Sequence, residues 1–512
     1  MYSVGSQTLG VTGFFDVLFD KKSIGLDAGA LQKVEESYRF LEKFSKGKVI
    51  YGVNTGFGPM AQYKIREKDR NELQYNLIRS HSSGCGQPLP PLYVKAVMLA
   101  RLNSLMKGYS GIHSDAVHLL AGMINNGIYP LIFEHGSVGA SGDLVQLAHV
   151  ALAMIGEGEV EYRGKIMPAA DALKKAKLKP MQMHIREGLA LMNGTSCMTG
   201  IGMINRIYAR NLLEWSVMAS AMINEIVESF DDHFSPELNH TKLHIGQQVI
   251  AEEIRQIVSD SKLIRRRPDH LYNKQIEADV LHDKVQEYYS LRCVPQILGP
   301  VYDTLLNAGE VLEKEVNSAN DNPIIDAGNN NVFHGGNFHG DYISFEMDKM
   351  KMAVTKLSML AERQLNFLLN DKLNNILPPF VNLGRLGFNF GLQGMQFTAT
   401  STVAENQTLA YPMYLHSIPN NNDNQDIVSM GSNAALITKK VIESSYQVLA
   451  IEMIAILQAI DHLKVQNKLA TRSKRIYTAL RQHVPRFEKD MPKYKEIGFL
   501  TGFLTENNPT KI

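Results

Sequence analysis

Two long apolar stretches in the second half of this 512-residue chain restrict it to a helical architecture. The segment VLAIEMIAILQAI, which begins at Val448, is apolar nearly all round, so it has to lie deep among other helices. From Met347 onward, apolar residues recur in steps of three and four, the period of a long helix with a buried face. These residues are Met350, Val354, Leu357, Ala361, Leu365 and Leu368. The 23 methionines suit irregular filling between such helices better than metal binding. We therefore expect a mainly α fold with a long central helical bundle.

Glycine-rich turns set the first 200 or so residues apart from the rest. Short extended pieces such as KVIYGV alternate there with NTGFGP, SSGCGQPLPP and GSVGASG, an organisation in which long functional loops connect helices. We expect a loop-rich N-terminal domain at 1–205, a central helical bundle with substrate-binding loops at 206–480, and a C-terminal tail packed on the bundle at 481–512.

The charge balance excludes several classes of partner. Lys and Arg total 53 against 52 Asp and Glu, a net charge of +1, which gives nucleic acids and anionic membranes no electrostatic attraction. A small molecule or another protein is the expected partner. The three cysteines, Cys85, Cys197 and Cys293, lack the spacing of a disulfide framework or a zinc site. The start MYSVGSQTLG has no signal-peptide pattern, and polar residues interrupt the longest uncharged window, 188–205. We expect a cytoplasmic protein.

The stretch EHGSVGASGDLVQLAHVALA, residues 134–153, places a compliant turn before a helix-periodic run. A phosphate-binding loop needs Lys followed by Ser or Thr after the glycines, whereas Asp143 and Leu144 follow Gly142 here. A nucleophile elbow needs Gly where Asp143 stands. The plainest remaining interpretation is a helix N-cap, in which Ser141 or Asp143 satisfies free amides and the glycines permit the turn.

A chemical interpretation of the same turn is also open. In a sufficiently tight turn, the unhindered amide nitrogen of Gly142 can attack the carbonyl carbon of Ala140, with loss of one water. Elimination of the Ser141 hydroxyl as a second water then leaves 4-methylidene-imidazol-5-one (MIO), an electrophile that no standard side chain provides. Ala140, Ser141 and Gly142 are small enough to permit this cyclisation.

Six motifs give the chain a specific resemblance. These are GSVGASGDL around Ser141, YGVNTGFGP at Tyr51, GLALMNGTS around Asn193, YYSLRCVPQ around Arg292, NDNP at Asn320 and GGNFHG at Gly335. In their order along the chain they resemble the aromatic amino acid ammonia-lyases and aminomutases, from about Tyr51 to Met430. The resemblance implies a histidine/phenylalanine ammonia-lyase-like fold, an MIO group formed from residues 140–142 in the N-terminal domain, and a homotetramer whose active sites combine loops from several subunits.

The resemblance also implies roles for individual residues. Tyr51 is the expected base for the substrate's β-proton, although a phenol serves near neutrality only beside positive charge or helix N-termini. Arg292 is the expected clamp for the substrate carboxylate, and Tyr289 and Gln286 should share one helical face with it. The resemblance places Asn193 against the prosthetic ring and Phe338 beside it as an aromatic wall. It also makes Tyr289 catalytic and Gly58 part of the substrate site.

The sequence predicts neither a metal nor a nucleotide. His334 and His339 flank a glycine pair, but no third ligand has a recognisable spacing. Gly52, Gly56 and Gly58 are too irregular for a dinucleotide-binding motif.

Three residues bear on which amino acid is the substrate. His81 lies where histidine- and tyrosine-selective family members carry His, so it can pair with a phenol or an imidazole. Histidine lyases carry Glu where Gln425 stands, and phenylalanine lyases carry Glu where Asn421 stands. This combination is most similar to tyrosine ammonia-lyases, which release p-coumarate and ammonia as in phenylpropanoid metabolism. A histidine ammonia-lyase, a tyrosine 2,3-aminomutase that returns ammonia to the β-carbon, and a non-enzymatic helical scaffold stay as alternatives.

Overall fold

The computed structural model describes residues 1–273, 279–281 and 284–512, which form two compact units. The first unit comprises Met1–Ile207, Ala308–Asp348 and Pro412–Lys439, and the second comprises Tyr208–Asn307, Lys349–Tyr411 and Lys440–Ile512. The chain first leaves the first unit close to the expected boundary at 205/206, but two later segments belong to that unit again. Each unit consists of three separate segments of the chain, because the chain passes from one unit to the other within long helices.

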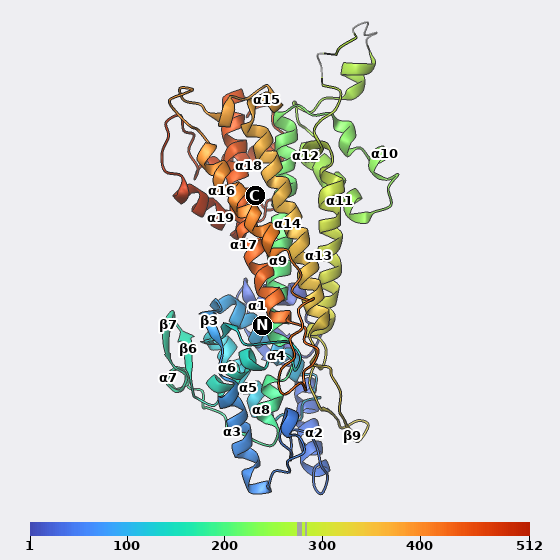
Figure 1. Ribbon diagram of the computed structural model, residues 1–512, viewed down its shortest axis with the longest axis vertical. Coiled ribbons are helices and arrows are strands. Elements are labelled where there is room, and N and C mark those ends of the chain that lie inside the picture. The colour runs from blue at the N-terminus through green and yellow to red at the C-terminus, as the bar shows by residue number, and fades with distance from the viewer. Residues whose placement is uncertain (274–278, 282–283) are drawn as a thin grey trace. The chain divides into compact units, whose positions relative to one another are not determined.

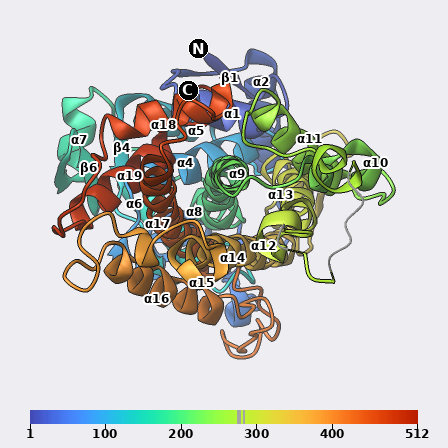
Figure 2. The same cartoon turned by 90° about the horizontal axis from the view of Figure 1, so that it is seen from above.

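Four long helices contribute one part to each unit. These helices are α9 (Ser196–Ile226), α13 (Val294–Val316), α14 (Asp341–Leu369) and α17 (Gly431–Leu463). In the second unit their segments run side by side, as Figure 1 and the view from above in Figure 2 both show. The expectation of a mainly α fold with a long helical bundle is confirmed.

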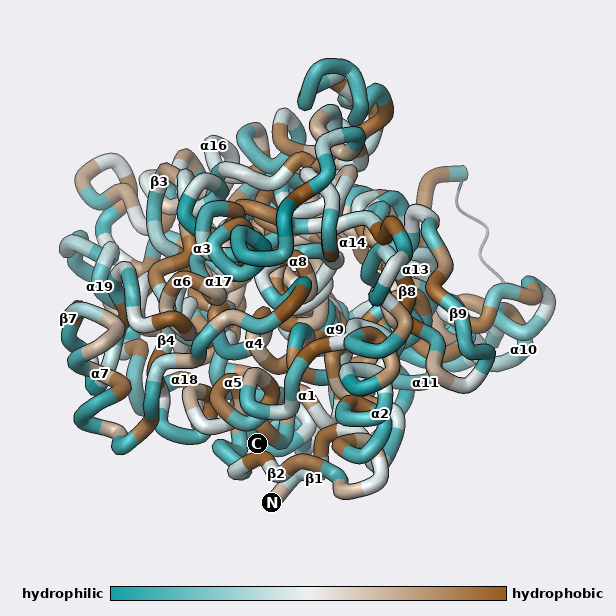
Figure 3. Tube along the Cα trace, turned by 90° about the horizontal axis from the view of Figure 1, so that it is seen from below, coloured by the Kyte–Doolittle hydropathy of each residue, from teal (hydrophilic) through white to brown (hydrophobic). Residues whose placement is uncertain are grey.

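The rest of the first unit consists of shorter helices and small sheets. Its helices are α1 (Val11–Leu18), α2 (Ala28–Phe44), α3 (Arg70–His81), α4 (Pro91–Leu105), α5 (Ser114–Asn126), α6 (Leu144–Met154), α7 (Ala169–Lys175) and α8 (Glu187–Met192). The strands β1 (Tyr2–Val4) and β2 (Ile24–Leu26) pair in parallel. The other pairings are antiparallel: β3 (Cys85–Pro88) with β5 (Phe133–His135), β4 (Ile128–Pro130) with β6 (Glu159–Tyr162) and then β7 (Lys165–Pro168), and β8 (Ile324–Asp326) with β9 (Asn331–Phe333). Figure 3 shows hydrophobic stretches in α5 and α6, which bury their apolar faces in this unit.

Shorter helices complete the second unit. They are α10 (Pro236–Asn239), α11 (Ile245–Val258), α12 (Tyr289–Arg292), α15 (Asp371–Asn374), α16 (Gln393–Leu409), α18 (Thr471–Arg481) and α19 (Tyr494–Glu506). The expected C-terminal segment 481–512 therefore supplies α19, and it belongs to this unit.

Both sequence patterns that predicted long helices describe the core correctly. The six apolar positions from Met350 to Leu368 are buried on α14, and every residue of the segment 448–460 is buried on α17. By length and composition α17 is the one helix in the described part of the chain that could cross a membrane, yet 89% of its most apolar window is buried inside the protein. Its apolar surface is used for packing.

The expected extended piece KVIYGV is not a strand. Residues 51–53 form turns, in which the carbonyl of Ile50 accepts the amides of Val53 (3.2 Å) and Asn54 (3.3 Å). The Asn54 side chain accepts the Ile50 amide at 2.9 Å and donates to the Lys48 carbonyl at 2.6 Å. The backbone satisfies its hydrogen bonds locally, so the apolar residues that favoured a strand do not decide the conformation.

Gly200 sets the closest approach of α9 to α4. A Cβ atom at this position would lie 2.7 Å from the Val97 nitrogen and 2.8 Å from the carbonyl carbon of Ala96, both in the α4 backbone. Backbone atoms cannot rotate away as a side chain does, so the two helices would have to separate.

We expect Gly200→Ala to destabilise the protein by about 1–3 kcal/mol through overpacking, although alanine favours helix. Gly502→Ala on α19, where a Cβ meets nothing within 4 Å, is the matched control and should be neutral or stabilising by up to about 1 kcal/mol. Denaturant midpoints of both variants and the wild type provide the measurement. Equal midpoints for Gly200→Ala and the wild type would contradict the packing argument.

Candidate active site

The turn before α6 is held by a backbone contact with a distant segment. Gly142 pairs with Gly194 in an isolated parallel bridge, and the Asp143 amide donates to the Gly194 carbonyl at 2.8 Å. Gly142 has φ +68°, and a Cβ there would lie 2.1 Å from the Gly194 oxygen. Only glycine fits this position, because both the left-handed conformation and the space exclude a side chain.

The carboxylate of Asp143 caps a different helix from the one the sequence suggests. Asp143 directly precedes α6, but its side chain does not cap that helix. Its Oδ2 accepts the amides of Cys197 and Met198, each at 2.9 Å, in the first turn of α9. Asp143 caps a helix, as the sequence predicts, but that helix is α9 and not α6.

Two hydroxyl groups complete the surroundings of Asp143. Ser137 Oγ donates to Oδ1 at 2.9 Å and Ser432 Oγ donates to the same atom at 2.6 Å. Burial raises the pKa of Asp143, and these four hydrogen bonds act against that rise. One carboxylate thereby ties the turn to the start of α9 and to the start of α17.

Side chains and backbone amides hold the segment 139–141 from several sides. The Gly139 carbonyl accepts the Gly340 amide and the Ser429 hydroxyl, each at 3.0 Å. Asn193 Nδ2 donates to the Ser141 carbonyl at 2.8 Å, and Gln425 Nε2 donates to the Ser141 hydroxyl oxygen at 2.9 Å. The segment Ala140–Ser141–Gly142 is therefore fixed by contacts from three distant parts of the first unit.

Ser141 faces a cavity of about 510 Å³ within the first unit. Most of the residues that the sequence proposed for the site line this cavity. They are Tyr51, Gly58, His81, Ser141, Asn193, Phe338, Asn421 and Gln425. Within the described parts of the chain, no residue that lines the cavity is Asp, Glu, Lys or Arg. The cavity therefore suits an uncharged ring, and it offers no cation for a carboxylate.

Tyr51 presents its hydroxyl group close to a backbone donor. The Gly58 amide donates to the Tyr51 phenolic oxygen at 3.0 Å, and the Phe57 ring meets the tyrosine ring edge-on with 6.1 Å between centroids. A Cβ at Gly58 would lie 2.8 Å from Asn421 Nδ2. The bare backbone at Gly58 thus leaves room for the Asn421 side chain at the cavity wall.

His81 is the last residue of α3, and its contacts indicate which nitrogen carries the proton. Its Nδ1 lies 2.9 Å from the Leu77 carbonyl oxygen. The Ser80 hydroxyl oxygen also lies 3.0 Å from Nδ1. A carbonyl oxygen can only accept, so in the tautomer that pairs with Leu77 Nδ1 donates and Nε2 is an acceptor. The half-buried ring therefore lends the cavity a hydrogen-bond acceptor.

Several lining residues were not anticipated from the sequence. One face of α3, at three- and four-residue steps, supplies Leu73, Asn76, Leu77 and Ser80 beside His81. Counting back from His81 in steps of four residues would have found Leu77 and Leu73. Asn322, Asn424, Leu144 and Leu189 also line the cavity. Asn322 lies in the recognised NDNP motif, but the motif alone gave it no contact.

Ala140 and Gly142 flank Ser141 in the first unit, and the other three proposed residues, Gln286, Tyr289 and Arg292, lie in the second unit. Gln286 and Tyr289 line a cavity of about 740 Å³ there, and the Arg292 guanidinium lies 4.8 Å from the centre of the Tyr289 ring. The expectation of one shared helical face is wrong for Gln286. Helix α12 begins only at Tyr289, after Tyr288 in extended conformation (φ −61°, ψ 157°).

No metal centre is present among the described residues. No group of three or more His, Cys, Asp or Glu side chains in these ranges is arranged to hold an ion. His339 Nε2 lies 3.3 Å from the Ile427 carbonyl, and its Nδ1 lies 3.5 Å from Asp341. His334 is exposed.

Comparison with known proteins identifies the family. The model of the aromatic amino acid lyase family matches residues 9–482. This chain belongs to that family. A tyrosine 2,3-aminomutase of Chondromyces crocatus is 38% identical over 499 residues, covering 96% of this chain and 94% of the relative. A histidine ammonia-lyase of Geobacillus sp. (strain WCH70) is 39% identical over 487 residues, covering 94% and 92%.

A solved structure shares the fold of this aromatic amino acid lyase. The tyrosine aminomutase from Streptomyces globisporus superposes with a TM-score of 0.95 at 35% identity, covering 100% of this chain and 98% of that one. The fold is histidine/phenylalanine ammonia-lyase-like, as the resemblance implied. Family membership makes the chain an enzyme of the carbon–nitrogen lyase class.

Glu187 begins α8, the short helix that leads to Asn193. Its carboxylate is fully buried and accepts the amides of His184 (2.6 Å) and His113 (3.1 Å). Burial raises the pKa of Glu187 to about 7. Because the folded-state pKa exceeds the ordinary value, the stability linked to Glu187 is fully present below about pH 4.5 and is lost as pH rises through about 7.

We expect Glu187→Gln to remove this pH dependence. At every pH the variant lacks one hydrogen-bond acceptor. Because only the wild type loses stability as Glu187 ionises, the free energy of unfolding of the variant relative to that of the wild type should rise by about 1–3 kcal/mol from pH 4.5 to pH 8. Denaturation curves of both proteins at the two pH values give the difference directly. A stability difference that is the same at both pH values would show that Glu187 does not titrate in this range.

Proposed function

We propose that this chain is a tyrosine ammonia-lyase, which converts L-tyrosine to trans-p-coumarate and ammonia in the cytoplasm. The observation that carries the proposal is the uncharged cavity in which Ser141 and the acceptor nitrogen of His81 both lie. A phenol hydroxyl can donate to His81 Nε2. Phenylalanine would leave that nitrogen unpaired, and such a site discriminates strongly against a substrate that lacks the polar group.

The lining of the cavity also supports tyrosine over histidine. An imidazole substrate pairs best with a carboxylate, and the described lining contains none. At position 425 a neutral glutamine stands, and its amide donates to the Ser141 hydroxyl. We propose that Asn421, Gln425 and Gly58 contact the substrate as neutral groups of this wall.

The residues around Ser141 fit the formation of MIO from Ala140–Ser141–Gly142. Gly142 must be glycine, which leaves its nitrogen unhindered, and Gln425 donates to the hydroxyl oxygen that would leave as water. Asn193 donates to the Ser141 carbonyl, and Phe338 lines the same cavity. Once formed, this group supplies an electrophilic carbon for the amine of the substrate.

The chain's own residues account for binding and proton transfer in the proposal. The amide that Gly58 donates to the Tyr51 oxygen stabilises negative charge there, which suits Tyr51 as the base that takes the β-proton. The part of the cavity wall that the structure describes holds no Lys or Arg, so in this proposal the substrate carboxylate needs a guanidinium from elsewhere. We propose that Arg292 binds it, with Gln286 and the catalytic Tyr289 beside it, in a homotetramer whose copies share each active site.

A tyrosine 2,3-aminomutase is the second candidate, because relatives with that name are 38–39% identical over 94–95% of their own length. The same residues would serve, with p-coumarate held until ammonia adds at the β-carbon. Incubation with L-tyrosine, followed by ultraviolet detection of p-coumarate and chiral analysis of β-tyrosine, separates the two. Urocanate from histidine or cinnamate from phenylalanine as the preferred product would overturn the tyrosine assignment.

The mass of the intact chain tests the prosthetic group. We expect the wild type to fall short of the sequence mass by two waters, and Ser141→Ala to lose most activity because the alanine side chain has no hydroxyl to eliminate. An unmodified wild-type chain would end this proposal.

The ratio of specificity constants for tyrosine and phenylalanine tests the role of His81. His81→Phe removes the acceptor, so we expect the preference to shift toward phenylalanine by roughly ten- to a hundredfold, the scale of a buried polar group left unpaired. His240→Phe, a change at an exposed position outside the cavity, is the control and should leave the ratio unchanged. If His81→Phe also leaves the ratio unchanged, His81 does not contact the substrate ring.

A further inference from the structure

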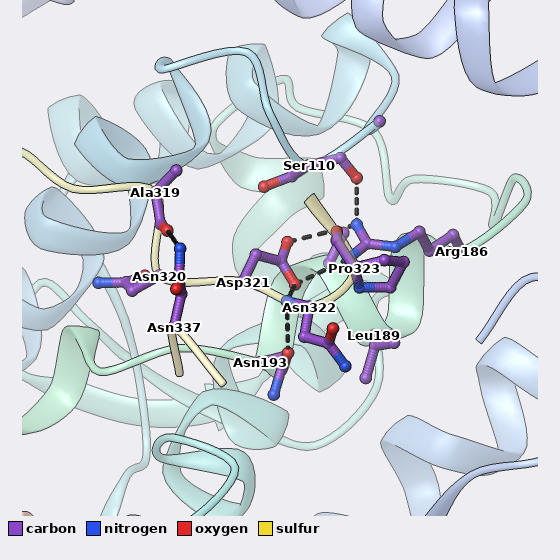
Figure 4. Close-up of polar contacts among 12 residues, drawn as sticks. Ser110, Arg186, Leu189, Asn193, Ala319, Asn320, Asp321, Asn322, Pro323 and Asn337 are labelled. Atoms are coloured by element: carbon purple, nitrogen blue, oxygen red, sulfur yellow. Dashed lines mark hydrogen bonds and ion pairs between the residues drawn. The ribbon is translucent and has the colours of Figure 1, made fainter. Parts of the chain in front are cut away.

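Arg186 and Asp321 form a buried ion pair close to Asn193. The side chains of Arg186 and Asp321 are 0% and 1% exposed, and Arg186 Nη2 lies 2.8 Å from Asp321 Oδ1 (Figure 4). The same guanidinium donates to the Pro323 carbonyl at 2.8 Å and to the Ser110 carbonyl. It therefore connects the residue before α8 to the segment 321–323.

Asp321 in turn fixes the donor that faces Asn193. The Asn322 amide lies 2.7 Å from Asp321 Oδ1 and 3.0 Å from Asn193 Oδ1 (Figure 4). The backbone N–H of Asn322 can only donate, so Asn193 directs its side-chain oxygen toward it, and Asn193 Nδ2 donates to the Ser141 carbonyl at 2.8 Å. If the Asn193 side-chain amide were turned by 180°, its oxygen would face the Ser141 carbonyl oxygen, and its NH₂ group would face the N–H of Asn322.

We propose that the Arg186–Asp321 pair is a positioning pair, which orients the Asn193 amide on the Ser141 carbonyl and thereby sets the rate at which residues 140–142 complete the prosthetic group. The inference rests on the proposed prosthetic group. Neither Arg186 nor Asp321 lines the cavity, so they act through Asn322 and Asn193 and do not touch the substrate.

The orientation of Asn193 matters in the second step of the cyclisation. In the first step, Gly142 N bonds to the Ala140 carbonyl carbon, and the carbonyl oxygen leaves as water with the amide hydrogens of Gly142 and Ser141. In the second, the Ser141 Cα–H proton and the side-chain hydroxyl leave as water, and a Cα=Cβ bond forms. A hydrogen bond donated to the Ser141 carbonyl stabilises the negative charge that develops there as the Cα proton departs. No oxidant or reductant is needed.

A role in stability alone does not account for this pair. Two buried ions gain little over well-packed apolar side chains of the same volume, whereas an apolar pair could not hold the backbone amide of Asn322 in place.

Asp321 also acts on a second buried guanidinium, that of Arg101. Burial lowers the pKa of Arg101 to about 10, and the charge of Asp321 opposes that fall. Arg101 donates to the Ala190 carbonyl on α8 and, at 3.4 Å, to Asn320 Oδ1, so both arginines join α8 to the segment 320–323.

The test follows ring formation by intact mass at successive times after synthesis of the full chain is stopped. Asp321→Asn keeps the size of the side chain but removes its charge, and we expect the loss of two waters to slow about tenfold, the effect of one poorly aligned hydrogen bond. Asn193→Asp, which removes the Nδ2 donor and leaves the pair intact, should slow it at least as much. Arg186→Lys keeps the charge without the two-pronged contact and should lie between Asp321→Asn and the wild type.

A largely buried ion pair elsewhere in the chain provides the control. Arg481 and Asp461 are 12% and 10% exposed and 2.7 Å apart, in the second unit. We expect Asp461→Asn and Asp321→Asn both to lower the thermal midpoint, and Asp461→Asn to leave ring formation at the wild-type rate. Slowing in both variants would show that lost stability is the cause and would overturn the positioning role.

The outcomes separate this inference from the proposed function. Ring formation at the wild-type rate in folded Asp321→Asn overturns the inference, and Arg186→Lys gives the same test if Asp321→Asn does not fold. A wild type that loses two waters but does not act on tyrosine refutes the proposed substrate and leaves this test intact. A wild type that loses no water refutes the inference together with the prosthetic group.

Discussion

The carboxylate of Asp143 is the interaction on which the candidate active site depends. Four donors converge on it, two from the backbone of α9 and two from the hydroxyls of Ser137 and Ser432. Because the group is fully buried, removing it would leave the first amides of α9 without a partner in a place that water does not reach. The turn that carries Ser141 is therefore tied through Asp143 to the first residues of α9 and α17.

The cavity in front of Ser141 combines neutral polar groups with apolar walls. Its asparagines, its histidine and Gln425 offer hydrogen bonds without a formal charge. In the proposed function, discrimination among aromatic rings depends on single donors and acceptors, and we assign that role to His81, whose Nδ1 lies 2.9 Å from the Leu77 carbonyl oxygen. Because the described lining holds no cation, the same proposal assigns the substrate carboxylate to residues outside this cavity.

Much of the architecture could be predicted from the sequence, because helical periodicity is a local signal. The buried faces of α14 and α17 follow from the spacing of their apolar residues, and the start of α6 follows from the end of the glycine run. Residues of the six motifs were predictable as well, and Tyr51, Asn193 and Phe338 from these motifs line one cavity together with His81 and Gln425, which were proposed separately. Three features could not be read from local sequence. Asp143 caps α9 and not its own neighbour, KVIYGV turns where apolar residues favour a strand, and Gln286 precedes the helix that carries Arg292. In the first two cases hydrogen bonds to particular partners outweigh the local pattern.

The contacts around the turn also determine when, during synthesis of the chain, the turn can adopt its tight form. Residues 139–143 are held by partners at 194, 340 and 429–432, and the last of these is separated from the turn by almost three hundred residues of chain. A ribosome has to complete most of the polypeptide before the full set of partners exists. Any chemistry that requires the tight form of this turn is therefore postponed until the first unit has been synthesised in full, so that an incomplete or misfolded chain carries an ordinary, unreactive Ala-Ser-Gly sequence.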